Sequence, residues 1–121
     1  MFISTGIDLT EISRIEKSIQ SPRFLSRVFS HEELEAFSAT KVRSLAANFC
    51  AKEAFSKALG TGVRGFALNE VSVLRNELGA PFLSFTGKAA EIVSSRGLSF
   101  SVSLSHSDDY ATAIVIAYSK E

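Results

Sequence analysis

The sequence predicts an α+β domain in which a largely antiparallel sheet packs on one long helix. Residues 47–60 are rich in strong helix formers and end at Gly60, a residue that commonly terminates helices. Residues 99–105 alternate strictly between serine and apolar side chains, which predicts a half-buried strand. Residues 110–118 are almost continuously apolar and contain β-branched side chains, so we expect a central strand buried on both faces.

The composition is that of a globular protein folded as one domain over residues 1–121. Its net charge of zero argues against nucleic-acid binding through bulk charge. Its single cysteine, Cys50, excludes an internal disulfide and suits a reducing compartment. No apolar run approaches the roughly 20 residues that span a bilayer, and the N-terminus lacks the features of a signal peptide. We therefore expect a cytoplasmic protein with neither a nucleic-acid partner nor a membrane partner.

The remaining elements follow from local signals. A short strand covers residues 2–9, and Thr10 is the expected N-cap of the helix that follows. Ser21-Pro22 starts a second short helix, through about Arg27. Further elements are a helix opened by the capping box of Ser30 and Glu33 and ending near Phe37, strands at residues 70–74 and 82–85, and a helix at residues 87–95.

The long helix carries a face of small residues and a charged pair. At about 100° per residue, one side of the helix holds four alanines, Ala47, Ala51, Ala54 and Ala58, on which a neighbouring backbone can lie close. Glu53 and Lys57 are four residues apart and are therefore neighbours away from this stripe. Taken alone, they are an ordinary surface ion pair that contributes a few tenths of a kcal/mol.

Asp8 is a lone carboxylate in the first strand, and taken alone it is better explained by helix capping than by a site. Asp8 and Glu53 together would suit Mg²⁺, which is commonly held by one or two carboxylates with water and phosphate in the remaining positions. Lys57 is a point charge of the kind that neutralises phosphate.

His106 lies at the turn after residues 99–105, and it either contacts a phosphate or caps the hairpin. Cys50 with His106 could form a nucleophilic pair, but a cysteine in a helix interior usually behaves as a buried apolar residue.

Four segments occur in order along the chain: Gly6-Ile-Asp8-Leu, Phe29-Ser-His-Glu-Glu33, Ala51-Lys-Glu-Ala-Phe-Ser-Lys57-Ala and Ser103-Leu-Ser-His106. Their combination resembles the holo-acyl-carrier-protein synthases, the short bacterial 4′-phosphopantetheinyl transferases, over nearly the whole chain. The resemblance implies a single-lobed transferase fold of that family. It also implies transfer of 4′-phosphopantetheine from coenzyme A to a serine of apo acyl carrier protein, with adenosine 3′,5′-bisphosphate as the second product in fatty acid biosynthesis.

The resemblance assigns roles residue by residue. Asp8 and Glu53 would be Mg²⁺ ligands, and Lys57 would be the cation beside the coenzyme A pyrophosphate, so these three form the implied catalytic set. The coenzyme A pocket would include Lys57, Ser105 and His106, with the turn containing Gly79 and Pro81 on the adenine side. The general base is left open between Glu53 and a metal-bound water.

The resemblance also implies partners. A basic face would dock the acidic carrier protein and would consist of Arg14, Lys17, Arg23 and Arg27, with Phe24 and the exposed side of Phe49 as apolar anchors. The implied assembly is a homotrimer with each site between neighbouring subunits.

Two positions depart from the family pattern. Many relatives have arginine in place of Asn48 and lysine in place of Ala80, so both changes remove a cation near a phosphorylated ligand. They bear on how the 3′-phosphate of coenzyme A is held. They also keep open two alternatives, a coenzyme A- or nucleotide-binding module without transferase activity and a structural or adaptor protein.

Overall fold

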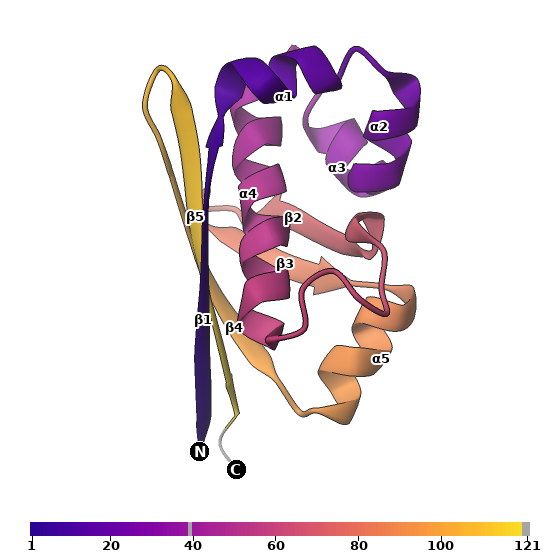
Figure 1. Ribbon diagram of the computed structural model, residues 1–121, viewed down its shortest axis with the longest axis vertical. Coiled ribbons are helices and arrows are strands. Elements are labelled where there is room, and N and C mark those ends of the chain that lie inside the picture. The colour runs from indigo at the N-terminus through magenta and orange to yellow at the C-terminus, as the bar shows by residue number, and fades with distance from the viewer. Residues whose placement is uncertain (39, 120–121) are drawn as a thin grey trace.

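Two layers form the body of the protein, a three-stranded antiparallel sheet and the helix that covers its inner face (Figure 1). The computed structural model describes residues 1–38 and 40–119. Its elements are β1 (Phe2–Glu11), α1 (Ile12–Ser18), α2 (Pro22–Val28), α3 (His31–Ala36), α4 (Val42–Leu59), a 3₁₀ turn (Leu68–Glu70), β2 (Val71–Arg75), β3 (Pro81–Phe85), α5 (Gly87–Ser95), β4 (Ser99–His106) and β5 (Tyr110–Ser119). The predicted α+β architecture with a long helix on an antiparallel sheet is confirmed.

The sheet has the order β1-β5-β4, and β2 and β3 form a separate antiparallel pair. Figure 1 shows α1, α2 and α3 gathered at one end of α4 and α5 near the other end. In the register of the main sheet, Asp8 of β1 lies opposite Ala113 of β5, which in turn lies opposite Leu104 of β4. The central strand β5 therefore separates Asp8 from β4.

Gly6 allows β1 to lie directly on α4. A Cβ atom at this position would be 1.9 Å from the carbonyl oxygen of Ala54 and 2.7 Å from the amide nitrogen of Ala58. The predicted alanine stripe is buried as expected, because Ala47, Ala51, Ala54 and Ala58 are each 0–4% exposed. The strand that carries Asp8 and the helix that carries Glu53 are thus held at backbone contact distance.

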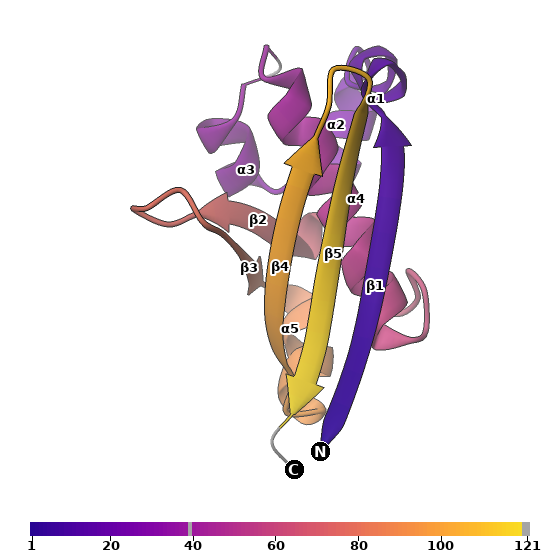
Figure 2. The same cartoon turned by 90° about the vertical axis from the view of Figure 1, so that its left-hand side faces the viewer.

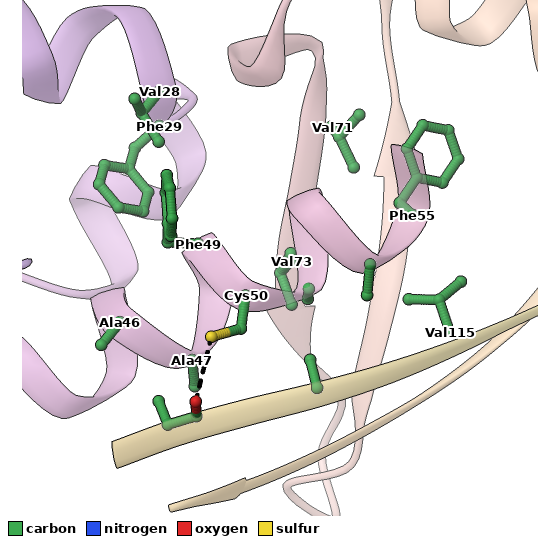
Figure 3. Packing of buried hydrophobic residues seen from close by; sticks show 14 of the residues in the cluster. Val28, Phe29, Ala46, Ala47, Phe49, Cys50, Phe55, Val71, Val73 and Val115 are labelled. Carbon is green, nitrogen blue, oxygen red and sulfur yellow. Dashed lines mark hydrogen bonds between the residues drawn. The ribbon is translucent and has the colours of Figure 1, made fainter. Parts of the chain in front are cut away.

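The core lies between α4, the sheet and the β2–β3 pair. Figure 3 shows Phe29 and Phe49 near α2 and α3, with Val71 and Phe55 farther along the cluster. Phe55 is fully buried, and its ring centroid lies 5.1–5.4 Å from those of three other rings, Phe66, Phe85 and Phe100.

Cys50 belongs to this core and not to a reactive site. Its thiol is fully buried and donates to the carbonyl oxygen of Ala111 at 3.3 Å (Figure 3). Burial raises the pKa of the thiol to about 11. The structure therefore favours a buried apolar residue over a nucleophilic partner of His106.

Three sequence-based expectations are wrong. Helix α4 begins at Val42, ahead of the expected start near Ala47. Thr10 does not cap α1, because β1 continues through Glu11, and the Thr10 hydroxyl instead donates to Asp8 Oδ2 at 3.0 Å.

The third concerns β5, which is central but is buried on one face only. Its inward residues, such as Val115, are buried, whereas three residues on the other face, Ile114, Ile116 and Tyr118, are each 36–38% exposed. Figure 2 shows this outer face of β1, β5 and β4 turned toward the viewer without a covering helix.

Candidate functional site

Asp8, Glu53 and Lys57 form a polar cluster, termed here the carboxylate cluster, where β1 crosses α4. The Lys57 ammonium donates to the carbonyl oxygen of Ile7 at 2.8 Å, and its Nζ lies 3.4 Å from Asp8 Oδ1. The Asp8 side chain is 18% exposed and that of Lys57 is 54% exposed, so the cluster opens to solvent. The strand and the helix supply one carboxylate each, as the sequence predicted.

The two carboxylates repel each other electrostatically. Burial raises the pKa of Glu53, and the nearby Asp8 charge raises it further, while Lys57 and Arg14 act in the opposite direction. A divalent cation between the carboxylates would relieve this repulsion. No group of three or more potential His, Cys, Asp or Glu ligands gathers among the described residues. The pair of carboxylates fits Mg²⁺, which commonly uses one or two carboxylates and fills its other positions with water and phosphate.

A second polar region lies at the opposite edge of the sheet, beside β4. It is a hollow of about 340 Å³, and its walls include Arg43, Arg75, Gly79, Pro81, Ser103 and His106. The turn between β2 and β3 is closed by Gly79, whose φ of 85° favours glycine. The structure thus brings His106 together with the turn that contains Gly79 and Pro81.

Ser105 does not line this hollow. It is paired with Thr112 of β5 on the exposed outer face of the sheet, whereas Leu104 points inward. The hollow and the carboxylate cluster also do not meet within one chain, because β5 lies between β1 and β4. Two strand spacings separate Asp8 from Leu104, or roughly 10 Å.

The basic residues expected to dock a partner lie on α1 and α2. All four, Arg14, Lys17, Arg23 and Arg27, are exposed. Arg23, Phe24 and Arg27 line a groove of about 820 Å³ that is closed on its other side by residues of the 63–69 segment.

The prediction that one side of Phe49 is exposed is wrong. Phe49 is only 8% exposed, and its ring packs on that of Phe24, with 6.2 Å between the ring centroids. Phe49 therefore packs against the half-buried Phe24 and exposes little surface to a docking partner.

Sequence reasoning missed a buried polar network that links α3, α4 and β2. Glu33 and Lys52 are both fully buried and form an ion pair with an Oε1–Nζ distance of 2.6 Å. Asn48 donates to Glu33 Oε2 at 2.9 Å and accepts from Arg75 at 2.9 Å. The ion pair of Glu33 was not predicted, because the capping box at Ser30 already explained a glutamate at this position without any long-range contact.

Comparison with known proteins identifies the family of this chain. The family model of the 4′-phosphopantetheinyl transferase superfamily matches residues 4–115, and the chain belongs to this superfamily. A holo-[acyl-carrier-protein] synthase of Clostridium beijerinckii is 42% identical over 119 residues, which cover 96% of this chain and 97% of that protein.

Two solved structures of synthases share the fold. The crystal structure of the enzyme from Neisseria meningitidis has a TM-score of 0.87 at 31% identity, covering 95% of this chain and 97% of that one. The enzyme from Helicobacter pylori in complex with coenzyme A has a TM-score of 0.83 at 30% identity, covering 94% and 99%. In the present chain, no helix among the described residues is long and apolar enough to cross a membrane.

Proposed function

We propose that this chain is a holo-[acyl-carrier-protein] synthase, formed by one domain over residues 1–121, that transfers 4′-phosphopantetheine from coenzyme A to a serine of apo acyl carrier protein. The observation that carries the proposal is the carboxylate cluster on a chain of this superfamily, with Asp8, Glu53 and Lys57 at the positions that the motif implies. Whole-length identity of 42% to a synthase supports the substrate pair.

In this reaction the serine oxygen attacks the phosphorus that carries the pantetheine arm, and the bond from that phosphorus to adenosine 3′,5′-bisphosphate breaks. Asp8 and Glu53 would hold Mg²⁺, which supplies positive charge to the pyrophosphate as this bond breaks. Lys57 adds a further positive charge beside the leaving phosphate. The serine proton would pass to Glu53 or to a water beside it.

The coenzyme A nucleotide would lie in the hollow between β4 and the β2–β3 turn. His106 would contact phosphate there, and Gly79 and Pro81 would line the adenine side, whereas Ser105 lies on the outer face of β4 and would not contact a nucleotide in the hollow. The hollow and the carboxylate cluster of one chain lie on opposite sides of β5, and this separation supports a site shared between two subunits.

The proposed assembly is a homotrimer, and the apolar outer face of the sheet supports association between chains. The most exposed residues of this outer face are Ile3, Ile7 and Leu9 of β1. They are 63–64% exposed and flank the exposed residues of β5. Contiguous apolar surface of this kind marks an interface. Light scattering should give three chains per particle, and Ile7→Glu should dissociate it, whereas Leu78→Glu, at a position 94% exposed in the β2–β3 turn, should not. A wild-type monomer would refute the shared site.

Docking of an acidic carrier protein would use the exposed basic residues of α1 and α2, with Phe24 as the apolar contact. The four basic residues concerned are Arg14, Lys17, Arg23 and Arg27. Phe49 would act only through its packing on Phe24.

The test incubates the protein with coenzyme A, Mg²⁺ and apo acyl carrier protein and then measures the mass of the carrier. We expect a gain equal to one phosphopantetheine. Glu53→Gln should abolish this gain while the fold is retained, and Glu91→Gln, an exposed position on α5, should leave it unchanged. An unmodified carrier, in a sample that a known transferase does modify, would overturn the proposal and leave the binding module as the explanation.

A further inference from the structure

We propose that Arg75 binds the 3′-phosphate of coenzyme A and that Asn48 is the positioning residue that holds its guanidinium at the hollow beside β4. This inference rests on the proposed function for the identity of the ligand. It gives a role to Asn48, the helix position at which the family resemblance implies a missing cation.

The first step is the environment of Asn48, whose side chain is fully buried. Its amide nitrogen donates to Glu33 Oε2 at 2.9 Å and to the carbonyl oxygen of Val73 at 3.0 Å. Both partners are acceptors, so a flipped amide would place its oxygen against two other oxygens. The amide orientation is therefore fixed, and Oδ1 is left facing Arg75.

The second step is the position of Arg75. Its Nη2 donates to Asn48 Oδ1 at 2.9 Å, and its Cζ lies 4.9 Å from the centroid of the Phe37 ring. Longer contacts of 3.5 and 3.4 Å join Nη1 to the carbonyl oxygens of Val73 and Leu74. These contacts hold the guanidinium in one place while leaving some of its five N–H donors for a ligand.

The third step is charge. Glu33 is already paired with Lys52, with both side chains fully buried. Arg75 forms no salt bridge within the described part of the chain, although it is partly buried. Burial lowers the pKa of Arg75, but a guanidinium remains protonated in proteins. The network thus carries one positive charge without a carboxylate of its own, and an anion in the hollow would compensate it.

The fourth step is the choice of phosphate. Arg75 is paired with Pro81 across the β2–β3 ladder and lines the same hollow as Arg43 and His106. Lys57 and its two carboxylates lie at the other edge of the sheet, and they would serve the pyrophosphate. Coenzyme A carries one further phosphate, on the 3′ position of its ribose. That group is the anion that remains for Arg75.

The binding test uses calorimetry without Mg²⁺ and compares adenosine 3′,5′-bisphosphate with 5′-AMP, so it does not depend on catalysis. Arg75→Gln should weaken binding of the bisphosphate about 10- to 100-fold, the usual worth of a hydrogen bond to a charged group, and should change 5′-AMP binding less than twofold. Arg75→Lys should recover part of the loss. Lys88→Gln, which removes an equal charge from exposed α5, is the control and should match the wild type.

The kinetic test separates positioning from a purely structural role. Arg75→Gln and Asn48→Ala should each raise the KM for coenzyme A, leave kcat within about twofold, and leave the KM for 3′-dephospho-coenzyme A unchanged. The double variant should equal Arg75→Gln alone, because Asn48 acts through Arg75. If Asn48→Ala does not fold, the Arg75 variants decide the question.

Equal losses for ligands with and without the 3′-phosphate would overturn the proposal, as would an unchanged affinity of Arg75→Gln for the bisphosphate. A wild-type protein that binds the bisphosphate but never modifies the carrier would refute the proposed function alone.

Discussion

The buried pair of Glu33 and Lys52 gives a sharp test of what holds α4 against β2. Replacing Lys52 with methionine keeps most of the side-chain volume but leaves the Glu33 carboxylate buried without its cation. The change also removes the donor to the carbonyl oxygens of Leu68, at 3.0 Å, and Val71. An unpaired buried charge costs about 3–5 kcal/mol, a large part of the roughly 5–15 kcal/mol that stabilises a domain.

Urea denaturation followed by circular dichroism measures this loss, with all variants at one protein concentration because association also affects the midpoint. Lys57→Met is the matched control on the same helix. Its side chain is 54% exposed, so its loss should stay below about 1 kcal/mol. Glu33→Gln combined with Lys52→Met should cost less than the sum of the single changes, because neither position then keeps a buried charge that has lost its partner. A Lys52→Met protein within 1 kcal/mol of the wild type would refute the reasoning.

Three further outcomes are expected. Gly6→Ala should lower the free energy of unfolding by about 1–3 kcal/mol and should also reduce carrier modification. The new Cβ atom would force β1 and its Asp8 away from the backbone of Ala54. Urea midpoints measure the first effect, and the carrier mass assay measures the second. Cys50 should react with a thiol reagent at neutral pH only after denaturation, since its pKa of about 11 leaves about one thiol in ten thousand ionised at pH 7. Fast labelling of the native protein would contradict its burial. Glu70 accepts from the backbone amides of Ala67 and Lys88, and these bonds hold its pKa below the ordinary 4.5. Its stabilisation should therefore be complete above that pH and disappear as the pH falls through the lower folded-state value, so that Glu70→Gln loses stability at neutral pH but converges with the wild type in acid.

Local signals were sufficient for most of the fold. The alternation over residues 99–105 placed β4, and the capping residues Ser21 and Ser30 placed the starts of α2 and α3. The start of α4 was missed because residues 42–46 lack a capping signal, and the structure finds no side-chain cap at its N-terminus. The burial of β5 was misjudged because an apolar run predicts burial without telling whether the chain itself or a second subunit covers each face.

The features of the site that could not be predicted from the sequence depend on contacts between distant segments of the chain. Asp8 and Glu53 were paired by the motif, and the structure adds the reason that they meet, which is the absence of a side chain at Gly6. Asn48 looked like a lost cation when α4 was considered alone. Its bond to Arg75 joins positions 27 residues apart in the chain, and no periodicity within the helix reports such a bond.

The two lysines of the Lys-Glu-Ala-x-x-Lys segment have different contacts because they point in different directions around the helix. Five residues rotate the helix by about 500°, so Lys57 points about 140° away from Lys52. Lys52 therefore enters the core and pairs with Glu33, whereas Lys57 faces β1 and Asp8. Glu53 lies only about 40° from Lys57 around the helix and shares its side. The buried ion pair is a weak source of net stability, so its contribution lies in fixing the rotation of α4 against α3 and β2. That rotation sets where Glu53 and Lys57 stand relative to Asp8, and it places Asn48 where it can hold Arg75. One helix orientation thus sets the position of both proposed anion-binding regions. The loss of Lys52 should therefore disturb both.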